Sequence, residues 1–194
     1  MIPLRDTQPS YSTPYITGGL IVLNVLLFLF EISMDQFTLN EFLSVFGVVP
    51  ARFTVPSLFT SMFLHGGWMH LIGNMWFLWI YGDNIEDILG KGKYIGFYLA
   101  CGVVAGLVHV VMNPASRVPT IGASGAIAGV MGAYMAKFPH SRILTLVPIF
   151  VFIQLIEIPA VFILAYWFLL QIFSGVGEIG YSNVSSGGVA WFAH

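Results

Sequence analysis

One serine in this chain stands where a nucleophile would be placed. Ser124 lies in the run Gly122-Ala123-Ser124-Gly125, at the start of an apolar segment. Small neighbours leave room for a substrate backbone, and the unpaired N–H groups of a helix N-terminus can hold a developing oxyanion. Serine is a weak nucleophile that needs an imidazole to accept its proton, and His194 on another segment is the candidate base.

Two further polar residues lie together on a separate apolar segment. His70 and Asn74 are four residues apart, so they share one face of a helix. Polar groups inside a membrane segment are costly and usually functional, which makes the pair a candidate part of the same site. The structural alternative is a hydrogen-bonded pair that fixes helix packing.

Helix packing or metal binding could also account for these residues. Small residues at Gly125, Gly129 and Ala133 follow the four-residue spacing by which membrane helices pack closely, and this spacing could be the reason for the glycines around Ser124. The histidines His65, His70 and His194 could instead bind a metal. Their spacing is not H-E-x-x-H and no carboxylate accompanies them, so we expect no metal and no other cofactor.

The composition is that of a membrane protein. Of 194 residues, 57% are hydrophobic and 8% are charged, against about 25% charged in a typical soluble domain. A net charge of -2 gives no basic surface for nucleic acid, so we expect the lipid bilayer and not nucleic acid as a partner. The single cysteine, Cys101, cannot form an intramolecular disulfide. Residues 1–10 show no signal or transit peptide pattern.

The apolar segments predict an all-α membrane bundle of six transmembrane helices, since about 20 apolar residues cross the hydrocarbon layer. Residues 1–14 would be an N-terminal tail and residues 15–194 the transmembrane domain. The first five predicted spans are Tyr15–Met34, Gly66–Tyr81, Tyr94–Met112, Ser124–Met135 and Pro159–Phe173. We expect Ile143–Ile158 to be an irregular or interfacial lead-in, with Pro159 as the first helical residue of the fifth span.

The sixth predicted span begins near Gly187 and is cut off at His194. Eight residues give roughly 12 Å of helix, whereas the hydrocarbon layer is about 30 Å thick. A carboxylate at His194 would then lie inside the membrane without a partner, which is expensive. We therefore expect the native helix to continue, by about 15 residues if it spans the layer.

Basic residues predict the orientation of the bundle. Five of the seven fall in the tail and in the second and fourth loops, namely Arg5, Lys91, Lys93, Lys137 and Arg142. Arg52 and Arg117 fall on the other side. This asymmetry places the N-terminus in the cytoplasm. It also places His70, Ser124 and His194 at one depth below the outer surface.

Four motifs in this order resemble the rhomboid family of intramembrane serine proteases. They are FLHGGWMHLIGN at residues 63–74, YGDNIED at 81–87, GASG at 122–125 and GVAWFAH at 188–194. The resemblance covers nearly the whole chain and implies the bacterial six-span form. It implies that Ser124 is the nucleophile and His194 the base.

The same resemblance assigns the oxyanion hole to His70, Asn74 and the N–H of Ser124. We expect Gly122, Ala123 and Met69, which adjoin these groups in the sequence, to contact the substrate. Two positions depart from the family pattern. Ala128 stands where an aromatic residue often packs on the catalytic imidazole, and Val55-Pro56-Ser57 stands near the place of a Trp-Arg pair.

The expected activity is cleavage of transmembrane segments of single-span proteins, near their outer end, in a bacterial inner membrane. The fifth span would correspond to the lateral gate of the family. Two alternatives remain: a catalytically inactive rhomboid-like protein that binds membrane clients, and a small transporter. The chain halves show no inverted repeat, which counts against a transporter.

Overall fold

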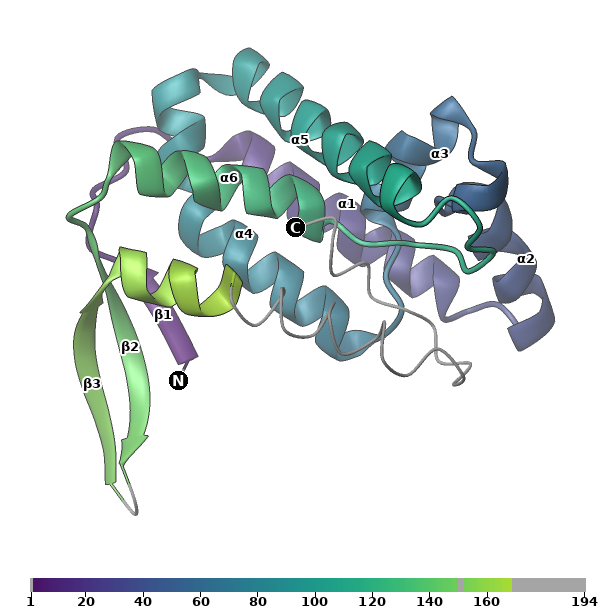
Figure 1. The fold of residues 1–194 in the computed structure, drawn as a ribbon. Helices are drawn as coiled ribbons and strands as arrows, with labels where there is room; N and C mark the ends of the chain where they lie inside the picture. The colour runs from purple at the N-terminus through teal and green to yellow at the C-terminus, as the bar shows by residue number, and fades with distance from the viewer. Residues whose placement is uncertain (1, 150–151, 169–194) are drawn as a thin grey trace.

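A computed structural model describes residues 2–149 and 152–168. Most of these residues are helical, and the long helices α1, α4, α5 and α6 pack side by side (Figure 1). The helices are α1 (Tyr15–Glu31), α2 (Gln36–Phe46), α3 (Val55–Thr60), α4 (Trp68–Leu89), α5 (Lys91–Met112) and α6 (Ser124–Lys137). Short 3-10 turns lie at η1 (Pro50–Arg52) and η2 (Ser61–Phe63), and a further helical stretch covers residues 160–168.

The first four predicted spans correspond to these four long helices. The starts at Tyr15 and Ser124 are confirmed, while α4 begins two residues later than expected and continues to Leu89. Within the described residues only α5 is both long enough and apolar enough to cross a membrane by those two criteria, and α1 is apolar but shorter. The count of six spans is not confirmed, and the predicted sixth span lies outside the described residues.

The centre of the bundle is formed by side chains of α4, α5 and α6. Tyr81, Tyr98 and Tyr134 are fully buried there with Leu78 and Val130. Close approach of α5 and α6 depends on a small residue, because a Cβ on Gly129 would collide with the side chain of Cys101. The tight packing expected of Gly125, Gly129 and Ala133 is thus realised at Gly129 against α5.

Glutamates connect α1 to α4 at one end and to the turn before α4 at the other. At one end the Glu86 carboxylate accepts hydrogen bonds from the backbone N–H groups of Ile16 and Thr17, at 2.9 and 2.8 Å. These are first-turn donors of α1, which no residue within the helix can satisfy. At the other end the Glu31 carboxylate accepts a bond from the backbone N–H of His65, at 3.2 Å.

The segment between the first two spans folds into short helices that we did not predict. Their start signals are present in the sequence. Asp35 caps α2 by accepting bonds from the N–H groups of Phe37 and Thr38, and Thr54 forms a capping box with Ser57 at the start of α3. These elements cover the end of the bundle where α4 and α6 begin.

A three-stranded antiparallel sheet departs from the all-α prediction. The order is β1 (Ile2–Asp6), β2 (Arg142–Ile149) and β3 (Phe152–Pro159), with Leu146 opposite both Ile2 and Leu155. The segment Ile143–Ile158, expected as an irregular or interfacial lead-in, is therefore regular and antiparallel in its described residues, 143–149 and 152–158. Pro148 cannot donate an intrahelical bond and β-branched residues are frequent here, both of which disfavour a helix. Pro159 ends β3, and the helix begins one residue later than predicted.

The N-terminal tail is tied to the bundle through β1. The carbonyl oxygen of Pro3 accepts a bond from the Trp76 indole at 2.6 Å, and the Asp6 carboxylate accepts one from the Tyr134 hydroxyl at 2.6 Å. Residues 2–6 thus contact α4, α6 and β2 through partners that lie 73 to 144 positions away in sequence.

Candidate active site

The starts of α4 and α6 place the predicted site residues near one another. Ser124 is the first residue of α6, and His70 is the third residue of α4. The two helices run in the same direction, because the C-terminal parts of both lie beside the N-terminal segment of the chain. Glu86 near the end of α4 bonds to the start of α1, and Tyr134 near the end of α6 bonds to Asp6. His70 and Ser124 therefore lie at the same end of the bundle.

Gly122 joins these two residues. A Cβ built on Gly122 would lie 2.8 Å from both Cε1 and Nε2 of His70 and 3.6 Å from the Ser124 Oγ. The residue has φ of +131°, a conformation that side chains rarely adopt, and its N–H donates to the carbonyl of Ser61 at 2.8 Å. The imidazole of His70 and the hydroxyl of Ser124 thus approach the same glycine, which only a residue without a side chain can occupy.

His70 and Asn74 both present polar atoms to the interior. Asn74 is 8% exposed, and neither its Nδ2 nor the Nε2 of His70 has a hydrogen-bond partner among the described residues. Buried polar atoms are normally satisfied, so donors in this arrangement are available to a ligand or water. The two residues do not bond to each other, which argues against the structural alternative of a hydrogen-bonded packing pair.

His65 lies behind His70. The two rings meet edge to face with centroids 5.1 Å apart, and neither ring nitrogen of His65 has a partner in the described part of the chain. The turn that carries His65 is held by Glu31, a residue whose role we did not foresee. A single carboxylate at the end of an otherwise apolar segment was the available signal.

A cavity of about 30 Å³ opens beside Ser124. It is lined by residues of η2, α5 and α6 and by the loop before Ser124, among them Ser61, Gly102 and Gly122. This volume is enough for a single water molecule, which needs polar partners such as the serine hydroxyl and backbone groups found here.

The remaining predicted residues have different outcomes. Met69 is 82% exposed at the start of α4. Ala123 is fully buried, so its side chain has no free surface for a substrate. His194 lies outside the described residues. The predicted Ser124–His194 dyad and the alternative metal site of His65, His70 and His194 both include it, so both stay predictions. In residues 2–149 and 152–168, no group of three or more His, Cys, Asp or Glu could hold a metal.

The loop before Ser124 is fixed by a third histidine. His109 of α5 lies 2.8 Å from the Thr120 hydroxyl through its Nε2, and Thr120 also pairs with Val48 in a short β-bridge. His109 therefore holds the loop that leads to Gly122 and Ser124.

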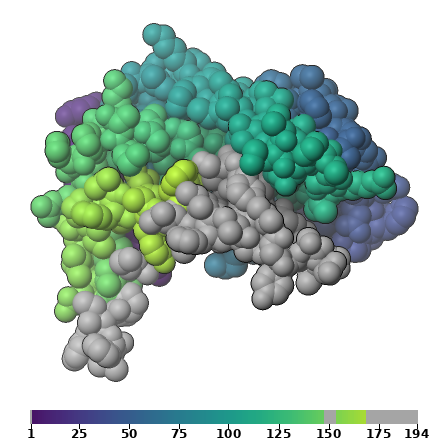
Figure 2. All heavy atoms as spheres, viewed as in Figure 1, coloured from purple at the N-terminus to yellow at the C-terminus, as the bar shows by residue number. Residues whose placement is uncertain are grey.

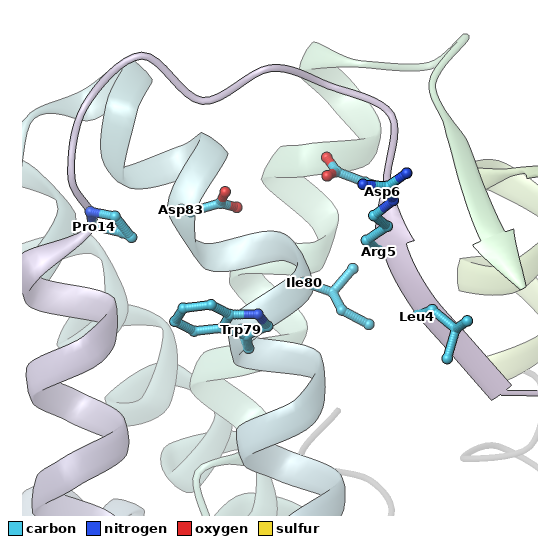
Figure 3. Close-up of a pocket in the computed structure, with 7 residues that line it drawn as sticks. All are labelled: Leu4, Arg5, Asp6, Pro14, Trp79, Ile80 and Asp83. Carbon is cyan, nitrogen blue, oxygen red and sulfur yellow. The ribbon is translucent and has the colours of Figure 1, made fainter.

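A second pocket, of about 100 Å³, lies at the opposite end of the bundle (Figure 3). Asp6 and Asp83 line it from β1 and α4, together with Arg5 and Trp79. It contains none of the residues predicted for catalysis.

Comparison with known proteins identifies relatives. A family model for the Rhomboid domain matches residues 52–194. The human presenilin-associated rhomboid-like protein, mitochondrial, is 34% identical over 139 residues, which is 69% of this chain and 36% of that protein. Rhomboid protease GluP of Bacillus subtilis is 35% identical over 127 residues, 63% of this chain and 24% of that protein.

A yeast relative matches a shorter part of the chain. Rhomboid protein 1, mitochondrial, of Saccharomyces cerevisiae is 33% identical over 95 residues, which is 47% of this chain and 28% of that protein. The matched regions span only about a quarter to a third of the length of these relatives.

Proposed function

This chain belongs to the rhomboid family, and from that premise we propose that it is a serine endopeptidase that cleaves transmembrane segments inside the bilayer. Members of the family are multi-pass membrane proteins that act on membrane-protein substrates. Ser124 acts as the nucleophile and His194 takes its proton, forming a dyad without a carboxylate. The substrates are single-span membrane proteins.

His70 and Asn74 stabilise the tetrahedral intermediate together with the N–H of Ser124. Three donors from two elements then surround the developing oxyanion, and donors fixed in advance cost no reorganisation during the reaction. Unpartnered buried Nε2 of His70 and Nδ2 of Asn74 support this role.

The observation that carries the proposal is the geometry at Gly122. His70 on α4 and Ser124 on α6 are more than 50 positions apart in sequence, yet both side chains approach one glycine with positive φ. The rhomboid protease of Bacillus subtilis, related over 63% of the chain, gives independent support.

The setting we propose is a bacterial plasma membrane with the N-terminus in the cytoplasm. The basic residues Lys91, Lys93 and Lys137 lie where α5 begins and α6 ends, and the start of α1 is at this same end. Basic residues favour the cytoplasmic side of a membrane. His70 and Ser124 then lie toward the outer leaflet.

Replacement of the nucleophile tests the proposal. Purified Ser124→Ala protein, incubated with a single-span model substrate, should lose cleavage almost entirely, since removal of a nucleophile from a site that acts as a unit takes away most of the rate. Ser44→Ala is the matched control, because its hydroxyl bonds only to a carbonyl within the surface helix α2.

Three outcomes are decisive. Cleavage by Ser124→Ala at the wild-type rate would contradict the serine mechanism. Binding of substrate by wild-type protein without cleavage would favour the inactive client-binding alternative. Inhibition by a chelator that zinc reverses would favour the metal site, whereas we expect a chelator and the change Cys101→Ala to have little effect.

A further inference from the structure

The hairpin of β2 and β3 divides into a charged base and an uncharged distal part. Arg142 and Glu157 are near the base, where Glu157 stands opposite Leu144. No Asp, Glu, Lys, Arg or His occurs from Ile143 to Ile156. An uncharged run of this length in a hairpin at the molecular surface needs an apolar or interfacial environment.

The rest of the fold covers the first part of β2 and leaves the middle of β3 exposed. Ile143 and Thr145 are fully buried, whereas Leu155 is 61% exposed and Ile156 is 37% exposed. Successive residues of a strand point to opposite faces, so Leu155 and Ile156, which lie at mid-length opposite Leu146 and Thr145, expose one apolar side chain on each face, between exposed Gln154 and Glu157. Exposed apolar side chains on both faces favour contact with an apolar environment on both sides of the strand over contact through one face alone.

The place of the hairpin in the fold agrees with this. It leaves the bundle at the end where α6 finishes and runs crosswise to the long helices, extending beyond them (Figure 1). In the space-filling view the same segment protrudes below the helices (Figure 2). Helices that cross a membrane stand roughly along its normal, so an element crosswise to their ends lies along the membrane surface.

The free edge of β3 limits the depth. Within the described residues β3 pairs with β2 alone, so the N–H and C=O groups of its outer edge have no strand partner. Hydrocarbon cannot satisfy such groups, but water and phosphate in the headgroup layer can. The apolar side chains favour immersion and the open edge prevents deep insertion, which together place the hairpin at the boundary between headgroups and acyl chains.

We propose that the distal part of the β2–β3 hairpin is a lipid-binding element that lies in the headgroup layer on the lysine-rich side of the membrane. Leu155 and Ile156 contact acyl chains, as the apolar face of an interfacial helix does. Exposed Arg142 and Lys137 lie at its base and suit anionic lipid headgroups, because basic residues next to a membrane surface are attracted to them. β3 leads directly into the helix at residues 160–168, so the lipid contact also sets where that helix begins.

Site-specific labelling tests the depth of the hairpin. In full-length protein with Cys101→Ala, the change Leu155→Cys provides one attachment site for a fluorescent probe, and His140→Cys provides the matched control. His140 is exposed in the turn before β2, at the same end of the bundle. Both proteins are reconstituted into vesicles of phosphatidylcholine with phosphatidylglycerol, and fluorescence quenching is measured with aqueous iodide and with lipids labelled at shallow or deep acyl positions.

We expect iodide quenching of the probe at residue 155 to be weaker than that of the probe at residue 140 by a factor of about three or more. The reason is that the interfacial boundary excludes a charged quencher. Shallow lipid quenchers should act on residue 155 more than deep ones. Equal iodide quenching at both positions would overturn the proposal, as would strongest quenching by the deep label. Protection from iodide without quenching by any lipid would assign the hairpin to a protein partner, such as a second copy of this chain. Replacing phosphatidylglycerol by phosphatidylcholine should weaken the protection, and no change would remove the role of Arg142 and Lys137.

Discussion

Gly122 is the residue on which the geometry of the candidate site most depends. Replacing it by alanine would put a Cβ 2.8 Å from the His70 ring at φ of +131°. We expect Gly122→Ala to lower the cleavage rate by about tenfold or more, because small displacements of catalytic groups have large effects on rate. The backbone strain should also cost on the order of 1–2 kcal/mol in unfolding free energy.

The control for this substitution is Gly73→Ala on α4. A Cβ there would meet nothing within 4 Å, and alanine is favoured over glycine within a helix by about 0.5–1 kcal/mol. Cleavage assays and thermal unfolding of both variants in one detergent make the comparison. Wild-type cleavage by folded Gly122→Ala protein would show that His70 need not approach this glycine.

Replacing either oxyanion candidate should reduce the cleavage rate less than replacing the nucleophile does. We expect His70→Ala and Asn74→Ala each to slow cleavage by about 10²–10³-fold without abolishing it, the typical effect of removing one oxyanion donor. Asn74→Ala should be the milder change if His70 and the Ser124 N–H still hold the oxyanion. Single-turnover cleavage at saturating substrate measures this, and an unchanged rate in either folded variant would remove that residue from the site.

Residue types and short spacings were sufficient to identify Ser124, His70 and Asn74. They were not sufficient for Glu31 or Ser61, whose partners lie 34 and 61 positions away. Local sequence carries no record of such pairs, because each partner is an ordinary backbone group.

At the scale of elements, the pair of α1 and α4 is held at both ends by a buried glutamate. Glu86 accepts two backbone bonds and Glu31 accepts one. We expect Glu86→Ala to lower the unfolding free energy by on the order of 3 kcal/mol and Glu31→Ala by about half as much, since bonds to charged groups contribute about 1.5–3 kcal/mol each.

Thermal unfolding in one detergent tests this order, with Glu41→Ala on the exposed helix α2 as the control. Glu86→Gln keeps an acceptor oxygen and should recover part of the loss. If Glu31→Ala proved the more damaging change, the number of backbone bonds would not explain the stability of this helix pair.

The long apolar helices could be predicted from hydropathy, but the elements between them could not. The starts of α1 and α6 followed from the beginning of each apolar run, whereas α2 and α3 are short and are defined by capping at Asp35 and Thr54. The hairpin was hidden for another reason. A fully apolar segment has no alternation of polar and apolar residues, so its sequence does not distinguish a strand from a helix. The apolar run of the hairpin also continues into a predicted span, so it was not recognised as a separate element.

At the scale of the whole molecule, the sheet joins the beginning of the chain to the segment after α6. Pairing of Ile2 with Leu146 cannot be predicted from local pattern, since antiparallel pairing across such a distance depends on the fold around it. The residues predicted as a separate tail therefore belong in part to the folded body, at the end of the bundle opposite Ser124.

Asp6 makes this connection sensitive to pH. Burial raises the pKa of its carboxyl above the ordinary value of 3.8, an effect larger than the opposing effect of the hydrogen bond from Tyr134, and Asp83 faces the same pocket (Figure 3). A raised pKa means that the folded protein holds this proton more tightly than the unfolded chain. The contribution of Asp6 to stability is therefore full below pH 3.8 and declines as pH rises through the raised pKa.

We expect the melting temperature of the wild type, relative to Asp6→Asn, to fall as the pH is raised above 3.8. Asp35 is the control of opposite sign. Its hydrogen bond from the Thr38 hydroxyl lowers its pKa, so the wild type relative to Asp35→Asn should lose stability as pH falls. Thermal unfolding of the three proteins in one detergent makes the test. If the difference for Asp6→Asn were constant with pH, or followed that for Asp35→Asn, the carboxylate of Asp6 would be ionised in the folded protein as readily as in water, and β1 would be joined to α6 by an ordinary surface hydrogen bond.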